Sequence, residues 1–132
     1  MSVLLDSHVW IWWLTGQKDL PARKRQLLDR LAQEGAPPFL AAISLWEAQM
    51  LYRKGRLRLE MDFPLWLSQA SDPSVVHVLP LDTSVVLALD KLPERFHGDP
   101  ADRIIVATAK AHGLELVTED RSIRKSRVVK VL

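Results

Sequence analysis

The chain has 132 residues, of which 48% are hydrophobic and 26% charged, and its formal net charge is +2. This length and composition are typical of one globular domain with its own core, and they exclude a disordered chain, a collagen-like fibre and a coiled coil. Cysteine is absent, and no apolar run approaches the ~18 residues of a membrane span, so we expect a single cytoplasmic domain over residues 1–132 with no disulfides, no thiolate metal site and no membrane association.

The first half of the chain alternates short β-rich segments with longer segments of helical periodicity. Pro37-Pro38 and Gly55 interrupt these segments. The predicted elements are a strand over 2–5, helices over 7–14 and 21–34, a strand over 39–43, a helix from Ser44 to about Lys54 and a helix over 62–71.

The second half continues the alternation, with His97 expected in a loop. Its predicted elements are a strand over 75–79, a helix over 83–91 capped by Asp82, a helix from Pro100 to about His112, a strand over 114–118 and a short fifth strand over 128–132. Strands that alternate with helices imply right-handed crossovers and a parallel sheet of four to five strands covered on both faces. In such an α/β fold, ligands bind outside the carboxyl ends of the strands.

Four acidic residues follow predicted strands or open the helices after them: Asp6, Glu47, Asp102 and Asp120. A parallel sheet brings such positions to one edge. Each acid also has a structural explanation. Asp6 is placed to cap the helix from Ser7, Asp120 is placed to close a turn, and Ser44 with Glu47 matches a capping box. Asp99 and Asp102 occupy the N-cap and N3 positions of the helix that begins at Pro100.

Two of these acids lie beside the apolar stripe of their helices. Glu47 has Met50 and Leu51 at i+3 and i+4, and Asp102 is followed at the same spacing by apolar residues, so both point toward the sheet edge. Two carboxylates ~4 Å apart repel by about 4 kcal/mol at an effective dielectric of 20, so a cluster needs a cation or bound protons. Without cysteine or a histidine pair at ligand spacing, this donor set suits Mg²⁺ or Mn²⁺ better than zinc, and phosphoester hydrolysis is the reaction it suits best.

The order and spacing of these motifs resemble those of a PIN domain, and more narrowly those of the VapC toxins of prokaryotic type II toxin–antitoxin systems. The resemblance covers essentially the whole chain, and its most specific part is Asp99-Pro100-Ala101-Asp102-Arg103 with the alanine-rich helix after it. The other matching motifs are Leu4-Leu5-Asp6-Ser7-His8, Ser44-Leu45-Trp46-Glu47 and Val117-Thr118-Glu119-Asp120. The resemblance implies a three-layer α/β/α Rossmann-like fold and a metal-dependent endoribonuclease that hydrolyses RNA phosphodiester bonds.

The resemblance also implies roles for residues of this chain. The catalytic set is Asp6, Glu47, Asp102 and Asp120. Of these, Asp6, Asp102 and Asp120 would hold Mg²⁺ or Mn²⁺, and Glu47 would orient or deprotonate the attacking water. Ser7, Thr118 and Asp99 match supporting positions, with Asp99 as the helix N-cap. Arg103 matches a position that contacts substrate phosphate or pairs with a carboxylate.

Expectations about partners come from the same resemblance. It implies a homodimer and a cognate VapB-like antitoxin whose C-terminal segment lies across the active-site groove. Because Trp10, Trp12 and Trp13 cannot all face one side of a helix, we expect at least one to be exposed and hypothesise that it serves such an interface. The clusters of basic residues, over 53–58 and near the C-terminus, are each expected to be solvated surface charge.

Two other classes of function stay open from the residues alone. Phosphatases and phosphotransfer domains of the haloacid dehalogenase or receiver type also end the first strand with an acid. However, Ser7-His8 lacks the second aspartate that a dehalogenase-like phosphatase needs two residues on, and a covalent aspartyl-phosphate would distinguish this class. A non-catalytic binding module on the PIN fold is disfavoured, because an idle acidic cluster costs stability, and such a module would bind no Mn²⁺.

Overall fold

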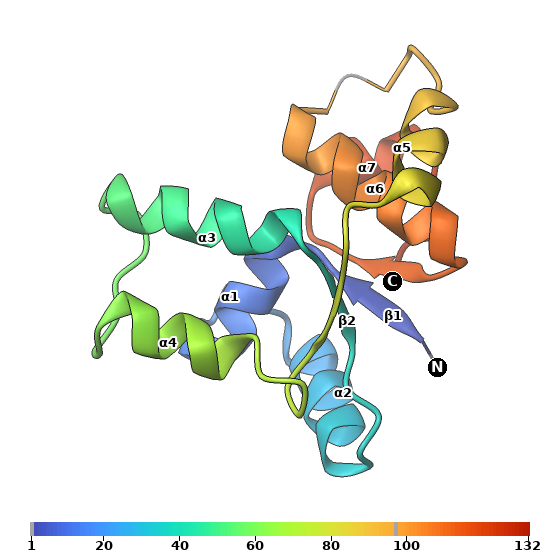
Figure 1. The fold of residues 1–132 in the computed structure, drawn as a ribbon. Coiled ribbons are helices and arrows are strands. Elements are labelled where there is room, and N and C mark those ends of the chain that lie inside the picture. The colour runs from blue at the N-terminus through green and yellow to red at the C-terminus, as the bar shows by residue number, and fades with distance from the viewer. Residues whose placement is uncertain (1, 97) are drawn as a thin grey trace.

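Four parallel strands form the centre of the molecule, and helices cover both faces of the sheet in a three-layer α/β/α arrangement (Figure 1). The computed structural model describes residues 2–96 and 98–132, so the expectation for His97 lies outside the described residues. The strands are β1 (Val3–Leu5), β2 (Phe39–Ala41), β3 (His77–Leu79) and β4 (Glu115–Val117), in the spatial order β3-β2-β1-β4. The chain builds outward from β1 through β2 and β3, then returns to place β4 on the other side of β1. The topological switch point, where open α/β sheets bind ligands, therefore lies between β1 and β4.

The helices connect these strands and largely follow the predicted positions. They are α1 (Ser7–Thr15), α2 (Ala22–Gln33), α3 (Ile43–Arg53), α4 (Phe63–Ala70), α5 (Thr83–Asp90), α6 (Pro100–His112) and α7 (Arg121–Ser126). No helix among the described residues is long and apolar enough to cross a membrane.

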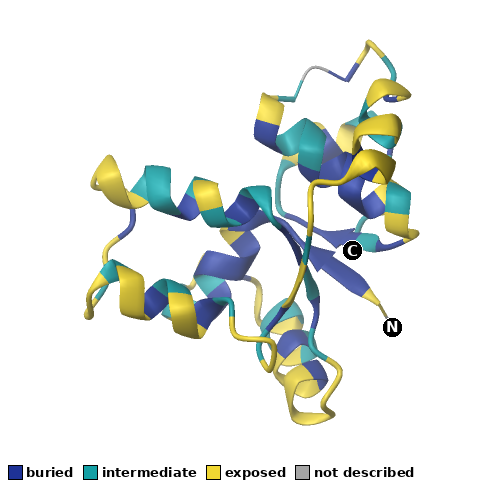
Figure 2. Cartoon of the chain, viewed as in Figure 1, coloured by how far each residue is buried: buried dark blue, intermediate teal, exposed yellow. Residues whose placement is uncertain are grey.

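The core lies in two layers, one on each face of the sheet (Figure 2). Val3 and Leu5 of β1 pack toward α1, α2 and α4, whereas Leu4 between them packs toward α5, α6 and α7, as the alternation of side chains along a strand requires. Trp10 is fully buried in the first layer and donates from Nε1 to the carbonyl of Ala70 at 3.0 Å. The expectation that at least one of the α1 tryptophans is exposed is wrong, because Trp10 and Trp13 are buried and Trp12 is half-buried against the core.

Three expectations about elements need correction. The predicted fifth strand over 128–132 is reduced to one parallel bridge between Leu116 and Val131, because the segment around it is irregular. Helix α7 was not predicted, since its six residues contain a single apolar side chain and show no periodicity. The second and third strands are shorter than predicted, and α3 begins one residue before Ser44.

Candidate active site

Asp6 is the buried acid at the centre of the site, at the carboxyl end of β1. Its backbone N–H donates to the carbonyl of Val117 on β4 at 3.0 Å, which fixes the residue at the switch point. Its Oδ1 accepts from the N–H of Ser7 at 2.8 Å, and its Oδ2 accepts from the hydroxyl of Thr118 at 2.6 Å. Only 6% of the residue is exposed, and this burial raises the pKa of Asp6 despite both hydrogen bonds.

Thr118 connects Asp6 to the acid that follows β4. Its single hydroxyl proton goes to Asp6, and the same oxygen accepts from the N–H of Asp120 at 3.0 Å. The Asp120 carboxylate caps α7 by accepting from the N–H of Ile123 at 2.9 Å. The structure therefore joins the ends of β1 and β4 through one buried threonine.

Glu47 reaches the same region from α3, and its contacts replace the predicted capping box. Ser44 lies inside α3, whose N-cap is Ala42, so it does not cap the helix. The Ser7 hydroxyl donates to Oε1 of Glu47 at 2.5 Å, and the fully buried Ser44 hydroxyl lies 2.7 Å from that of Ser7. Because the proton of Ser7 is committed to Glu47, Ser44 donates to Ser7. Burial raises the pKa of Glu47.

Asp102 stands in the first turn of α6 and feels the charge of the other acids most strongly. Asp99 caps this helix by accepting from the N–H of Asp102 at 2.8 Å, as predicted. Burial, followed by the negative charges of the neighbouring acids, raises the pKa of Asp102 to about 7. The acids that contribute are Asp6, Asp99, Asp120 and Glu47. The other predicted acids therefore all lie close enough to Asp102 to raise its pKa.

One cavity of about 340 Å³ collects these side chains. It is lined by Asp6, His8, Trp12, Glu47, Asp99, Asp102, Glu119 and Asp120. His8 is the sole basic residue among those lining it, so the cavity holds a concentration of negative charge inside a protein of net charge +2. We refer to it below as the acidic pocket.

Three predicted site residues do not line the acidic pocket: Ser7, Thr118 and Arg103. Ser7 and Thr118 hydrogen-bond to its acids, whereas the Arg103 guanidinium donates to the carbonyl of Phe96 and lies over the Phe96 ring, 5.8 Å from the ring centroid. These contacts hold Phe96 against α6. A role for Arg103 in binding substrate stays a prediction.

A second polar cluster supports the loop between β4 and α7, and no motif in the sequence predicts it. Lys24 on α2 donates to the carbonyl of Thr118 at 3.0 Å and to Glu119 at 2.7 Å, and Arg124 on α7 donates to the same two groups. Burial pushes the pKa of Glu119 upward, but its bonds to Lys24 and Arg124 outweigh this and lower it. Since Lys24 and Thr118 are 94 residues apart, no local pattern predicts the contact.

The chemistry of the acidic pocket fits a hard divalent cation, although the side chains do not yet surround one point. Carboxylate oxygens are the ligands that Mg²⁺ and Mn²⁺ prefer, and burial, followed by neighbouring acids, raises the pKa values of Asp6, Glu47 and Asp102. Within residues 2–96 and 98–132, no three His, Asp or Glu side chains are arranged to hold a metal ion as they stand. Several of their oxygens are instead occupied as helix caps, so ligation requires side-chain rotation.

Comparison of the sequence with known families and proteins gives a consistent result. Residues 3–128 match the PIN domain family. The chain is 40% identical over 126 residues to "Ribonuclease VapC22" of Mycobacterium tuberculosis, an alignment that covers 96% of this chain and 92% of that protein.

Solved structures share the whole fold. The toxin–antitoxin complex VapBC2 from Rickettsia felis, bound to a DNA fragment from its promoter, superposes with a TM-score of 0.72 at 15% identity, covering 100% of this chain and 98% of the other. FitAB bound to the IR36 DNA fragment superposes with a TM-score of 0.68 at 26% identity, covering 100% and 94%. These similarities support the three-layer architecture described above.

Proposed function

The chain belongs to the PIN domain family, and from this premise we propose that it is a metal-dependent endoribonuclease that acts as the toxin of a type II toxin–antitoxin system. The observation that supports the proposal most directly is the acidic pocket at the switch point, where the pKa of Asp102 is raised to about 7. The identity to a ribonuclease over nearly the full length of both chains supports the same reaction.

The residues of the pocket divide into those that would hold an ion and those that would act on water. We assign Asp6, Asp102 and Asp120 to a Mg²⁺ or Mn²⁺ ion, which would supply an activated water and neutralise charge on the phosphodiester. Glu47 is held by the Ser7 hydroxyl and is assigned the proton of the attacking water. Ser7, Thr118 and Asp99 orient these acids through the hydrogen bonds given above.

The surroundings of Asp6 favour a metal ligand over a phosphotransfer nucleophile. The carboxylate accepts hydrogen bonds from Ser7 and Thr118, which fix it beside the other acids that line the pocket. His8 stands where a dehalogenase-like phosphatase needs its second aspartate.

The proposal extends to partners. The related structures include VapBC2 bound to a DNA fragment from its promoter, FitAB bound to the IR36 DNA fragment and a toxin–antitoxin complex from Klebsiella pneumoniae. We propose a cognate VapB-like antitoxin and a homodimer for this chain too. Exposed apolar side chains offer surfaces for these contacts: Trp46 and Tyr52 on α3, and Val86 and Leu87 on α5.

The test is RNA cleavage by the purified protein with Mg²⁺ or Mn²⁺ and with EDTA, followed by sequencing of RNA 5′ ends after brief expression in cells. Asp6→Asn should lower cleavage by more than about 100-fold, because it removes a proposed metal ligand. Asp19→Asn, the same change at an exposed acid outside the pocket, should cleave normally. Full activity of Asp6→Asn, or cleavage that persists in EDTA, would refute the proposal.

A non-catalytic module is distinguished by calorimetry. Titration of Mn²⁺ into the wild-type protein should show binding, and Asp6→Asn should weaken it. If neither variant binds Mn²⁺, the acidic pocket is not a metal site.

A further inference from the structure

The charge of the chain is strongly polarised along α7 and the segment after it. Five of the 18 basic residues and none of the 16 acidic residues fall within residues 121–130. The rest of the chain has 13 basic residues against 16 acidic ones. This basic segment begins directly after Asp120, which lines the acidic pocket. Along the chain, the last acid of the acidic pocket is therefore followed directly by the basic residues of α7 and of the segment after it.

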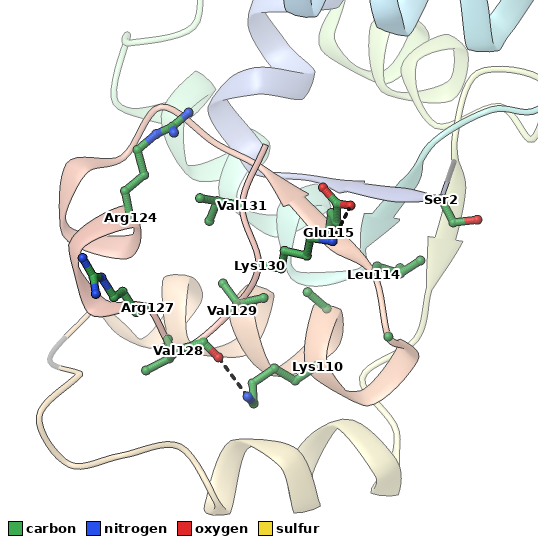
Figure 3. A pocket seen from close by; sticks show the side chains of 12 residues that line it. Ser2, Lys110, Leu114, Glu115, Arg124, Arg127, Val128, Val129, Lys130 and Val131 are labelled. Atoms are coloured by element: carbon green, nitrogen blue, oxygen red, sulfur yellow. Dashed lines mark hydrogen bonds and ion pairs between the residues drawn. The ribbon is translucent and has the colours of Figure 1, made fainter.

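A cavity that shares no lining residue with the acidic pocket lies beside this segment. It has a volume of about 960 Å³ and is lined by Ser2, by the end of α6, by the start of β4 and by Arg124 and residues 127–131 (Figure 3). Four basic side chains line it, and Glu115 is the single carboxylate among the lining residues. The basic residues are Lys110, Arg124, Arg127 and Lys130.

Two of these cations are used by the fold. Lys110 donates to the carbonyl of Val128 at 2.8 Å, which holds the C-terminal segment against α6. Arg124 donates to the carbonyls of Thr118 and Leu132, at 2.8 and 3.2 Å. Arg124 lines this cavity and also donates to Glu119, which lines the acidic pocket. One arginine therefore connects the two cavities.

The other two cations are available to a ligand. Arg127 is exposed and makes no hydrogen bond or ion pair through its side chain within the described part of the chain. The Lys130 side chain is 78% exposed, and its pairing with Glu115 at 3.3 Å is of the surface kind that contributes little. Both come from the segment over 127–130 that lines the cavity, with Arg127 at the end of α7 and Lys130 beside Glu115 of β4 (Figure 3).

Arg127 also occupies a backbone position that favours glycine. It ends α7 with φ of 55°, and it is the one non-glycine residue with positive φ among those described. Helices α1 and α6 end in the same conformation with Gly16 and Gly113. A side chain in this region costs free energy relative to glycine. At this left-handed position, where α1 and α6 have glycine, the chain therefore keeps an arginine, which points to a use for the guanidinium.

We infer that this cavity binds the phosphate backbone of RNA that extends from the acidic pocket along α7, with Arg127 and Lys130 contacting phosphates. The inference rests on the ribonuclease proposed above and names a second contact region for its substrate. A polyanion fits because the cations are spread along a segment rather than gathered around one point. The expectation of merely solvated charge does not account for the cavity or for the conformation of Arg127.

The test measures RNA binding without cleavage. Asp6→Asn serves as the background, and a fluorescein-labelled single-stranded RNA of about 20 nucleotides, longer than one binding site, is titrated by anisotropy at several NaCl concentrations without divalent ions. Arg127→Gln/Lys130→Gln should weaken binding several-fold. It should also reduce the slope of log affinity against log salt by about 1.4, since each lost phosphate contact on a single strand contributes about 0.7.

Two matched double variants define the location. Lys18→Gln/Arg30→Gln removes the same charge from exposed positions before and on α2, and it should leave the slope unchanged. Arg95→Gln/Lys125→Gln removes two positive charges from the cavity on the other side of α7. This variant should lower RNA affinity less than Arg127→Gln/Lys130→Gln does. Equal losses for all three pairs, or a loss confined to the Arg95/Lys125 pair, would overturn the inference.

Arg127→Gly separates binding from stability. It should raise the melting temperature, because glycine suits the positive φ, and weaken RNA binding at the same time. A purely structural role predicts the opposite for stability and no effect on binding. Suppose that the wild type cleaves RNA, but Arg127→Gln/Lys130→Gln binds RNA as tightly as Lys18→Gln/Arg30→Gln. Only the inference about the basic cavity is then refuted. If the wild type neither binds nor cleaves RNA, the proposed function is lost as well.

Discussion

At the scale of single residues, the environment of Glu47 is set by two serines from different helices. Ser44 donates to Ser7, and Ser7 donates to the Glu47 carboxylate. A hydroxyl that already accepts a hydrogen bond is a better donor, because neighbouring bonds polarise one another. The pair therefore favours the ionised form of Glu47 against the burial that raises its pKa.

Replacement of Ser7 and Ser44 should show how far their hydrogen bonds control the pKa of Glu47. Ser7→Ala removes the donor to Glu47, so the pKa of Glu47 should rise further and the acidic limb of the pH–rate profile should move to higher pH. Ser7→Thr keeps the hydroxyl and should leave the limb in place. Ser44→Ala should move the acidic limb of the pH–rate profile less than Ser7→Ala does. It should also lower the free energy of unfolding by about 1 kcal/mol, as is typical for the loss of one buried hydrogen bond. A pH–rate profile that is identical in Ser7→Ala and the wild type would contradict this role.

Sequence patterns located the acids of the site better than the groups that hold them. The acids follow strands or open helices, and those positions meet whenever a parallel sheet forms. Ser44 was misassigned because three-residue spacing to Glu47 is shared by a capping box and by a helix interior. Only the packing of α3 against α1 turns its hydroxyl toward Ser7.

At the scale of elements, α2 and α7 together hold the loop that presents Asp120. Lys24 of α2 and Arg124 of α7 both donate to the Thr118 carbonyl and to Glu119. The Lys24 side chain is only 12% exposed, so this ion pair is screened less than a surface pair. The loop is therefore fixed from two sides, and Glu119 is held by cations at the edge of the acidic pocket.

Lys24→Met should loosen this loop without touching any proposed ligand. Loss of its charged hydrogen bonds should cost about 1.5–3 kcal/mol of stability and weaken Mn²⁺ binding several-fold, as measured by calorimetry. Arg30→Met, an exposed position on the same helix, should change neither quantity. Partial recovery of Mn²⁺ affinity in Lys24→Arg would support the positioning role. A loss of stability with unchanged Mn²⁺ affinity would leave Lys24 a purely structural residue.

Elements with strong local signals were predicted, and those defined by tertiary contacts were not. Asp82 and Asp99 cap α5 and α6 as expected. Both caps are predictable because an aspartate directly precedes a segment whose apolar residues recur with helical spacing. Helix α7 offers only Ile123 as a buried residue, and its stability depends on the Asp120 cap and on packing in the second core layer. The segment over 128–132 has the β-branched composition of a strand, but only Val131 forms a bridge with β4.

At the scale of the whole molecule, the fold places its acids where they oppose folding in the absence of a cation. Burial and the neighbouring acids raise the pKa of Asp102 from 3.8 to about 7, and the pKa values of Asp6 and Glu47 are raised by burial in the same direction. The folded protein thus binds protons more tightly than the unfolded chain. Stability should therefore fall as the pH rises from about 4 to about 7, with no further change from Asp102 above that range.

Thermal unfolding of the metal-free protein should show this dependence. In EDTA, the melting temperature should be higher at pH 5.5 than at pH 7.5, with about 4 °C for each kcal/mol of stability. Asp102→Asn should reduce the difference, because the substituted amide does not titrate. Glu119 has a lowered pKa, so its ionised form stabilises the folded state, and this stabilisation is lost as the pH falls. The loss occurs in solutions more acidic than pH 5.5.

Metal should reverse the trend, because it binds the ionised carboxylates of the folded state and competes with protons for them. Addition of Mn²⁺ should therefore raise the melting temperature more at pH 7.5 than at pH 5.5, and scarcely at all in Asp6→Asn. An equal gain at both pH values would mean that Mn²⁺ binds elsewhere. A melting temperature in EDTA that rises from pH 5.5 to pH 7.5 would mean that charge repulsion in the acidic pocket does not govern stability.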